Sequence, residues 1–311
     1  MLRSTETLES VRKPTGRRVW RGREDAIGGY LMVAPTVLGL GVFALWPIVQ
    51  SLYLSFTSWG AFGKYQWTGL ENYQRLLGDA EAWRAFLNTL LLAVGAVPGS
   101  IVLAVVIAAL LNQRIRGVGV YRLIYFLPVV TMPAASAMIW KWLYNGDYGL
   151  INQALALVGI DGPRWLTTSA TVIPALVVVA IWSGIGLNMV ILLAGLQGIP
   201  SSLYEAAALD GAGRVATFVS ITLPLLTPTI FLLLIINTIS NLQLFELVYL
   251  MLGTDNPRIA EAQTAVYLFY QTGFAEGDKG YAATIIVVLF LLIMAFTALQ
   301  FRLQKKWVHY E

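Results

Sequence analysis

Residues 197–228 read QGIPSSLYEAAALDGAGRVATFVSITLPLLTP, and they separate two long apolar segments of the chain. Ser202 and Glu205 have the spacing of a capping box, in which the hydroxyl and the carboxylate satisfy exposed N–H groups at the start of a helix. We therefore predict a short, alanine-rich helix over 203–209. Gly211 ends this helix, because glycine accepts the positive φ that a helix stop requires.

A second short helix is predicted over 213–222, so the two helices form a compact protrusion between the two apolar segments. Two short helices cannot bury their apolar side chains by themselves. They need the cleft of another protein, as in recognition of a helix by a groove. The apolar residues of the protrusion include Leu203, Ala207, Leu209, Val215, Phe218 and Val219.

Six segments of the chain are long and apolar enough to cross a bilayer, which takes about 20 residues. Of all residues, 57% are hydrophobic and 12% charged, and the mean hydropathy is +0.68. A soluble domain averages about 25% charged residues, so a soluble enzyme or a nucleic-acid binder is excluded. The sequence predicts an all-α, polytopic membrane protein with six transmembrane helices. The predicted spans are 28–56, 85–111, 119–144, 171–196, 223–252 and 281–303.

Several kinds of chemistry lack the residues that they need. The chain has no cysteine and one histidine, His309, which excludes thiolate chemistry, a histidine metal cluster and a Ser/His/Asp triad. It contains no G-x-x-x-x-G-K-[ST] phosphate loop. We therefore expect no catalytic residue, no metal site and no cofactor in this chain.

The basic residues orient the chain. If residue 1 is cytoplasmic, 14 of the 21 Lys and Arg residues fall on the cytoplasmic side, seven of them in the tail 1–27. Basic residues are retained inside, so both this tail and the tail 304–311 are predicted to be cytoplasmic, with one membrane domain over 28–303. The basic tail is expected to contact lipid headgroups, and no removable signal peptide is expected.

Two longer external loops, near 57–84 and 145–170, are rich in tryptophan and tyrosine. Such aromatic residues are typical of anchors at the membrane interface. A docking surface for an external partner is the alternative interpretation.

Polar residues interrupt the fourth and fifth spans, where such side chains usually face a cavity or the bundle interior. Gly184 and Asn188 share a face of the fourth span by their spacing. Amides and hydroxyls offer the donors and acceptors that sugar hydroxyls need, whereas hydrogen bonding that only holds the helices together is the alternative. The residues that share a face of the fifth span are Asn237, Ser240, Asn241 and Leu244.

Glu246 is the only carboxylate predicted inside a span. A charge at the bilayer centre costs about 2.5–3.5 kcal/mol on insertion scales, so this residue is a candidate for substrate contact and equally for a structural or gating role. A proton-coupled secondary transporter with Glu246 as its proton site is an alternative function. An intramembrane enzyme is another, but Glu246 has no obvious partner carboxylate.

The 197–228 segment resembles the EAA loop of ABC importer permeases. The resemblance lies in Glu205-Ala206-Ala207, then Gly211, then nine residues before Ile221-x-Leu223-Pro224, within the longer sugar-permease pattern LYEAAxxDGAxxxxxFxxITLPxxxP. Shorter pieces agree with it, among them Gly69-Leu70-Glu71-Asn72-Tyr73 and Gly280-Tyr281-Ala282-Ala283. The resemblance covers about 55 to 311 and is to the first-subunit type of the maltose and glycerol-phosphate importers.

The resemblance implies the architecture of a type I ABC importer permease in a prokaryotic inner membrane. Its loop, 197–224, would dock into a cytoplasmic ATPase dimer, a separate chain that binds ATP and Mg. A second, different permease subunit and an extracytoplasmic solute-binding protein are the other implied partners. The implied ATPase-coupling residues are Glu205, Ala206, Ala207, Asp210, Gly211, Phe218, Leu223 and Pro224.

The resemblance also implies a sugar as the transported solute. Substrate contacts in permeases of the maltose type correspond to Gly184, Asn237, Ser240, Asn241 and Leu244, to which helical spacing adds Asn188. One departure is visible: where many relatives carry Gly-Gly-Pro after the fifth span, this chain has Gly253-Thr254-Asp255-Asn256-Pro257. The departure concerns the conformation of the external loop.

Overall fold

The computed structural model describes residues 24–59, 65–113 and 116–308. Most of the predicted basic tail, together with His309, lies outside the described residues. The chain divides into two units, residues 1–50 and 51–311. The first unit consists of α1 (Glu24–Leu40), a π-helical turn (Gly41–Leu45) and the beginning of α2 (Trp46–Leu54), which together provide the first apolar helix, Gly28–Leu54.

The second unit is built around four long helices, which are α4 (Ala80–Leu111), α8 (Ser169–Gln197), α11 (Leu223–Leu242) and α15 (Lys279–Gln304). Their ranges agree with the second, fourth, fifth and sixth predicted spans, except that the fifth ends early. Five helices of the described residues can cross a membrane by length and composition, and a sixth span results if one bent helix pair is counted as one. The all-α membrane fold is therefore confirmed.

Two glycines allow a close contact between α4 and α8. Gly95 and Gly99, four residues apart on α4, face α8, where a Cβ on Gly99 would lie 2.5 Å from Cδ1 of Ile181. A Cβ on Gly95 would lie 3.0 Å from both methyl groups of Val177. Small residues at this spacing let two membrane helices approach closely.

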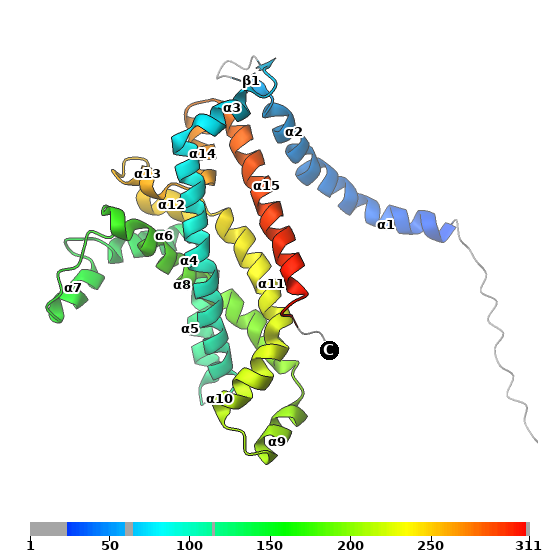
Figure 1. The fold of residues 1–311 in the computed structure, drawn as a ribbon, viewed down its shortest axis with the longest axis vertical. Coiled ribbons are helices and arrows are strands. Elements are labelled where there is room, and N and C mark those ends of the chain that lie inside the picture. Colours follow the sequence, from blue (N-terminus) through cyan, green and yellow to red (C-terminus); the bar gives the residue numbers. More distant parts are fainter. Residues whose placement is uncertain (1–23, 60–64, 114–115, 309–311) are drawn as a thin grey trace, which may run out of the picture. The chain divides into compact units, whose positions relative to one another are not determined.

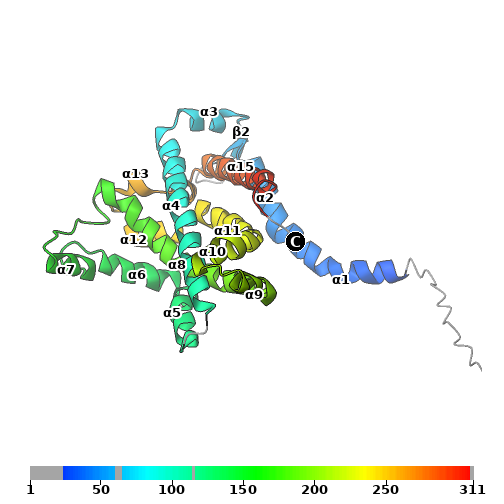
Figure 2. The ribbon, with the colours of Figure 1, turned by 60° about the horizontal axis from the view of Figure 1, so that its bottom comes forward.

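The third predicted span, 119–144, does not form one helix. It consists of α5 (Val118–Val130) and α6 (Pro133–Leu143), which are bent by 101° at Thr131 and Met132. The cause is local, because proline disfavours the helical conformation of the residue before it, and Met132 has a ψ of 132°. Figure 2 shows α6 turning away from α5.

The fifth predicted span, 223–252, is also broken. Helix α11 ends at Leu242, and α12 (Glu246–Leu252) begins after Gln243–Phe245. The freed carbonyl of Leu244 accepts a hydrogen bond of 2.7 Å from the Thr264 hydroxyl. The break is therefore compensated by a side chain from a neighbouring segment, as is required within a membrane.

Short elements occupy the two ends of the second unit. Strands β1 (Thr57–Trp59) and β2 (Tyr65–Trp67) pair antiparallel, with Thr57 opposite Trp67, and α3 (Glu71–Gly78) follows. This end, which we call the hairpin end, is at the top of Figure 1, whereas α9 (Ser201–Leu209) and α10 (Arg214–Thr217) lie at the bottom, the α9 end. The remaining short helices are α7 (Leu150–Leu157), α13 (Ile259–Ala262) and α14 (Ala265–Tyr270), with π-helical turns at Phe218–Thr222 and Gln271–Ala275.

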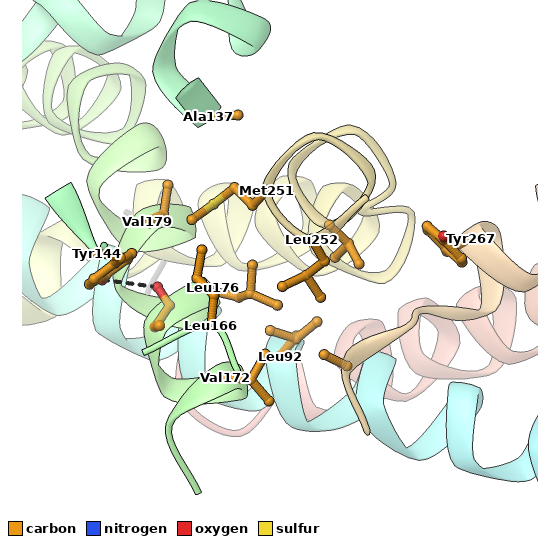
Figure 3. Packing of buried hydrophobic residues seen from close by; sticks show 13 residues of the cluster. Leu92, Ala137, Tyr144, Leu166, Val172, Leu176, Val179, Met251, Leu252 and Tyr267 are labelled. Carbon is orange, nitrogen blue, oxygen red and sulfur yellow. Dashed lines mark hydrogen bonds between the residues drawn. The ribbon is translucent and has the colours of Figure 1, made fainter. Parts of the chain in front are cut away.

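One apolar cluster ties the broken helices to the bundle (Figure 3). Leu176 of α8 packs among side chains of α4, α6 and α12, including Leu92 and Met251. Tyr144, just after α6, donates its hydroxyl to the carbonyl of Ala175 at 3.2 Å. The cluster therefore fixes both short helices against α8.

A polar network joins α4 and α15 at the hairpin end. Asp79 caps α4 by accepting from the N–H groups of Glu81 and Ala82, and it also accepts from the Tyr281 hydroxyl. Burial raises the pKa of Asp79, but these hydrogen bonds and the nearby Arg75 outweigh it and lower the pKa below its ordinary value. Arg75 in turn forms a 2.6 Å ion pair with Asp278, which caps α15.

Gly280 tests the close packing at this end. We predict that Gly280→Ala destabilises the chain by about 1–3 kcal/mol, because the new Cβ would overlap the carbonyl oxygen of Thr57. The midpoint of thermal unfolding, followed by tryptophan fluorescence in detergent, should fall by about 2–4 °C for each kcal/mol. Gly119→Ala on α5 is the control, because no heavy atom lies within 4 Å of its Cβ position. Equal midpoints for the two variants would contradict this packing.

Candidate functional site

The two helix breaks and α8 line an open cavity of about 410 Å³. Its walls come from the α5–α6 break, from the middle of α8, and from α11 and the start of α12. The structure brings together every residue predicted from sequence to contact substrate, although they come from three elements. Those lining residues are Gly184, Asn188, Asn237, Ser240, Asn241, Leu244 and Glu246.

Two buried asparagines form the floor of this cavity. Asn188 and Asn237 are 2% and 7% exposed. Each donates to the other, at 3.2 Å from Asn188 Nδ2 and at 2.9 Å from Asn237 Nδ2. Asn237 also donates to the carbonyl of Leu233 at 2.8 Å and accepts from the Ser100 hydroxyl at 3.4 Å. The pair therefore links α8 to α11, which is the structural role that the sequence left as an alternative.

The other polar residues are more accessible from the cavity. Ser240 and Glu246 are exposed, and Asn241 is half-buried with its Nδ2 donating to the Asn237 carbonyl at 2.9 Å. Glu246 is the first residue of α12, where the helix dipole favours a negative charge. Its carboxylate is thus at a helix start beside a cavity and not within a continuous apolar helix.

Gly184 lines the cavity next to the asparagine pair, and because it has no side chain it leaves space there. A Cβ at this position would lie 3.6 Å from Ser100 Cβ, 3.7 Å from Asn237 Oδ1 and 3.8 Å from Asn188 Nδ2. An alanine would fit at ordinary contact distances. A larger side chain would extend into the cavity.

Three further hydroxyls line the cavity and were missed from the sequence. They belong to Thr131, Ser136 and Ser183. Thr131 and Ser136 lie on either side of the α5–α6 break. The third span was predicted as one straight helix, and such a helix gives no reason to place these two residues at the cavity. Pro133 was the available signal, since a proline can start a new helix. Among the residues that the structure describes, neither a lysine nor an arginine lines the cavity.

At the α9 end, the predicted loop is present with two differences. Helix α9 begins directly after Pro200 with no side-chain cap, so the capping box of Ser202 and Glu205 is wrong. The predicted separate helix over 213–222 is also wrong, because the helix from Arg214 continues through a π-helical turn into α11. The chain therefore runs as one helix from Arg214 to Leu242.

The turn at Gly211 is as predicted. Its φ is +72°, a conformation that side chains rarely adopt. The N–H of Ala212 donates to Ala207 at 2.9 Å and that of Gly211 to Ala208 at 3.2 Å, which is the pattern of a Schellman motif. A positive φ at this position thus sets the direction of the chain after α9.

The predicted coupling residues divide into two groups. Glu205, Ala206, Asp210 and Gly211 are exposed, whereas Ala207, Phe218, Leu223 and Pro224 are buried or half-buried. Two apolar neighbours, Leu209 and Val215, are 90% and 77% exposed. Tyr204, which was not predicted, shares a 3.1 Å hydrogen bond with Thr222 and so holds α9 against the α11 helix. The tip of the loop thus presents apolar side chains and a carboxylate to the surroundings.

Residues 100–309 match the family model described as "Binding-protein-dependent transport system inner membrane component". The chain belongs to this family. The probable ABC transporter permease YesP of Bacillus subtilis is 36% identical over 93% of this chain and 94% of its own length. The trehalose/maltose permease MalF of Thermococcus litoralis is 34% identical over 86% of this chain and 90% of its own.

The fold has a counterpart among solved structures. A chain of a bacterial alginate ABC transporter, crystallised with a periplasmic protein that carries an alginate pentasaccharide, superposes with a TM-score of 0.80. The match covers 93% of this chain and 98% of that chain at 23% identity. The type I ABC permease architecture is thereby confirmed, and the proton-coupled alternative gains no support. Among the described residues, no group of three potential metal ligands occurs.

The structural role of the asparagine pair can be distinguished experimentally from the role of the accessible cavity residues. We predict that Asn237→Leu destabilises the protein by about 1–3 kcal/mol, because Asn188 would be left buried without its partner. Ser240→Ala should leave the unfolding midpoint unchanged, because this side chain is exposed to the cavity. Thermal unfolding of both variants in detergent measures the difference. An Asn237→Leu protein as stable as the parent would show that the pair does not hold α8 to α11.

Proposed function

We propose that this chain is one of two permease subunits of an ATP-driven importer for a sugar or oligosaccharide, and that the 410 Å³ cavity contacts the solute. The observation that carries the proposal is the lining of the cavity, in which four hydroxyls, three amides and one carboxylate converge from α5–α6, α8 and α11–α12. Such groups supply both donors and acceptors to a polyhydroxylated solute. Relatives are named for trehalose and maltose, for lactose and for sn-glycerol-3-phosphate.

The α9 end is proposed to be cytoplasmic and to dock into a separate ATPase dimer, which would bind ATP and Mg. Leu209 and Val215 are the exposed apolar residues that a cleft would cover, with Glu205 as the charged contact. With this orientation both termini are cytoplasmic, which agrees with the bias of basic residues.

Coupling between the ATPase and the cavity follows from continuity of one helix. The helix that begins at Arg214 beside the α9 turn is the one that carries Asn237, Ser240 and Asn241. Displacement of α9 by the ATPase would therefore move a wall of the cavity directly. The chain supplies no covalent chemistry in this account; it binds the solute and alternates its access to the two sides.

The complete transporter requires three partners besides membrane lipid. These are the ATPase dimer, a second and different permease subunit, and an extracytoplasmic solute-binding protein that delivers the sugar. The family description, which names binding-protein-dependent transport, supports the last of them.

Substitutions at two glycines test the role of the coupling loop. We predict that Gly211→Val lowers ATP-dependent uptake into proteoliposomes at least tenfold, because valine cannot adopt the φ of +72° without about 1–2 kcal/mol of strain. Gly213→Ala is the matched control, since its φ is −71° and its Cβ position is open. Uptake and co-purification of the ATPase are measured on the same preparations. Undiminished uptake by Gly211→Val would contradict the coupling role.

Gly184 tests the cavity. Gly184→Leu should abolish uptake by filling the space above the asparagine pair, whereas Gly184→Ala should retain it, because a single Cβ fits at 3.6 Å or more. Both variants should still co-purify with the ATPase, so that a loss of uptake is not due to a failure of the transporter to assemble. If the leucine variant transports as well as the alanine variant, the cavity is not on the solute's path.

A further inference from the structure

The side chains that line the cavity between the two helix breaks give it a negative charge. Glu246 is the one ionisable residue in the lining that the described residues provide, and no basic side chain borders the cavity beside it. The Glu246 carboxylate is exposed and has no ion-pair or hydrogen-bond partner within the described part of the chain. Its charge is therefore not neutralised by this chain.

The helix ends at the two breaks do not change this balance. The first break brings the end of α5 and the start of α6 to the cavity, and the second brings the end of α11 and the start of α12. The start of a helix carries a partial positive charge and its end a partial negative charge of similar size. Each break therefore contributes one helix end of either sign, and the two offset each other. The full charge of Glu246 remains.

A carboxylate among amides and hydroxyls distinguishes solutes by their charge. It accepts charge-assisted hydrogen bonds from the hydroxyls of a neutral sugar. A sugar that carries its own carboxylate, sulfonate or phosphate is repelled, and none of the described lining residues is a cation that would pair with it. The repulsion is stronger beside protein than in bulk water, because the effective dielectric constant is lower there.

Family membership leaves the charge of the solute open. Relatives are named for trehalose and maltose and for lactose, which are neutral, and also for sn-glycerol-3-phosphate, which is an anion. The same architecture thus occurs with solutes of both classes. The side chains that line the cavity of this chain are what distinguishes between them.

We infer that Glu246 makes the cavity selective for charge, so that the transporter accepts neutral sugars and rejects anionic ones such as uronates, sugar sulfonates and sugar phosphates. The inference rests on the proposed function, and it narrows the solute from sugars in general to uncharged sugars. Glu246 acts on the solute directly, through its own charge, and not by positioning another residue.

The electrostatic potential of the cavity can be measured with charged thiol reagents. The chain has no cysteine, so Ser240→Cys places its only thiol on the cavity wall. The assembled transporter is treated with two methanethiosulfonates, one with a trimethylammonium group and one with a sulfonate group, and mass spectrometry of this chain follows the modification. The ratio of the cationic to the anionic rate is divided by the same ratio for a free thiol. We expect a normalised ratio well above that of the free thiol.

Substitutions at Glu246 in the Ser240→Cys background separate charge from structure. Glu246→Gln should lower the normalised ratio about tenfold, and Glu246→Lys should bring it below that of the free thiol. Glu246→Asp keeps the charge and should stay within about twofold of the parent. A purely structural or gating role would change both rates alike and leave their ratio unaltered. Asp161→Asn is the control, since this exposed carboxylate does not line the cavity.

Uptake provides the second readout. Proteoliposomes that contain the complete transporter and ATP are given the solute-binding protein that stimulates its ATPase. They are offered a mixture of neutral mono- and disaccharides with uronates and sugar phosphates of matching size, and their contents are identified by mass spectrometry. A neutral sugar should accumulate, and the anionic sugars should stay outside.

The outcomes distinguish this inference from the proposed function. A normalised ratio that Glu246→Gln leaves unchanged, or ATP-dependent accumulation of an anionic sugar, would overturn the charge selectivity and leave the importer function standing. A parent ratio below that of the free thiol would also overturn it, because the second permease would then supply a positive charge that outweighs Glu246. Accumulation of neither class would overturn the proposed sugar import and the inference together.

Discussion

The need to satisfy every backbone group within the membrane governs this fold. Hydrocarbon offers no hydrogen-bond partner, so a spanning helix can break only where the protein itself compensates. At the α5–α6 break the Thr131 hydroxyl donates to the Leu127 carbonyl at 2.8 Å. At the α11–α12 break the Thr264 hydroxyl donates to the Leu244 carbonyl at 2.7 Å. The two breaks are thus stable, and the polar residues that compensate them are adjacent to the cavity that they open.

The breaks also leave the cavity bordered by continuous helices and by two short ones. The continuous helix from Arg214 to Leu242 links the exposed α9 turn with the cavity, whereas the short α6 and α12 connect the cavity with the loops at their other ends. The asparagine pair at the cavity floor holds α8 and α11 together between these regions.

Much of this arrangement could be predicted from the sequence, because it depends on local rules. Apolar length gave the spans, the 3.6-residue period placed Asn237, Ser240 and Asn241 on one face, and an Asp-Gly pair marked the positive φ at Gly211. The helix breaks could not be predicted in the same way. Pro98, Pro174 and Pro228 lie inside continuous helices, whereas Pro133 begins a new one, so the presence of a proline does not by itself locate a break. The close contact at Gly99 likewise depends on which helix faces it.

The most direct test of the account is a structure of the assembled transporter, determined by electron cryomicroscopy with its sugar and a non-hydrolysable ATP analogue. Solute density is expected between α8 and the α11–α12 break, within hydrogen-bond distance of Ser240 or Asn241, with α9 seated on the ATPase. Solute density that contacts neither break, or an uninterrupted fifth span from Leu223 to Leu252, would contradict it.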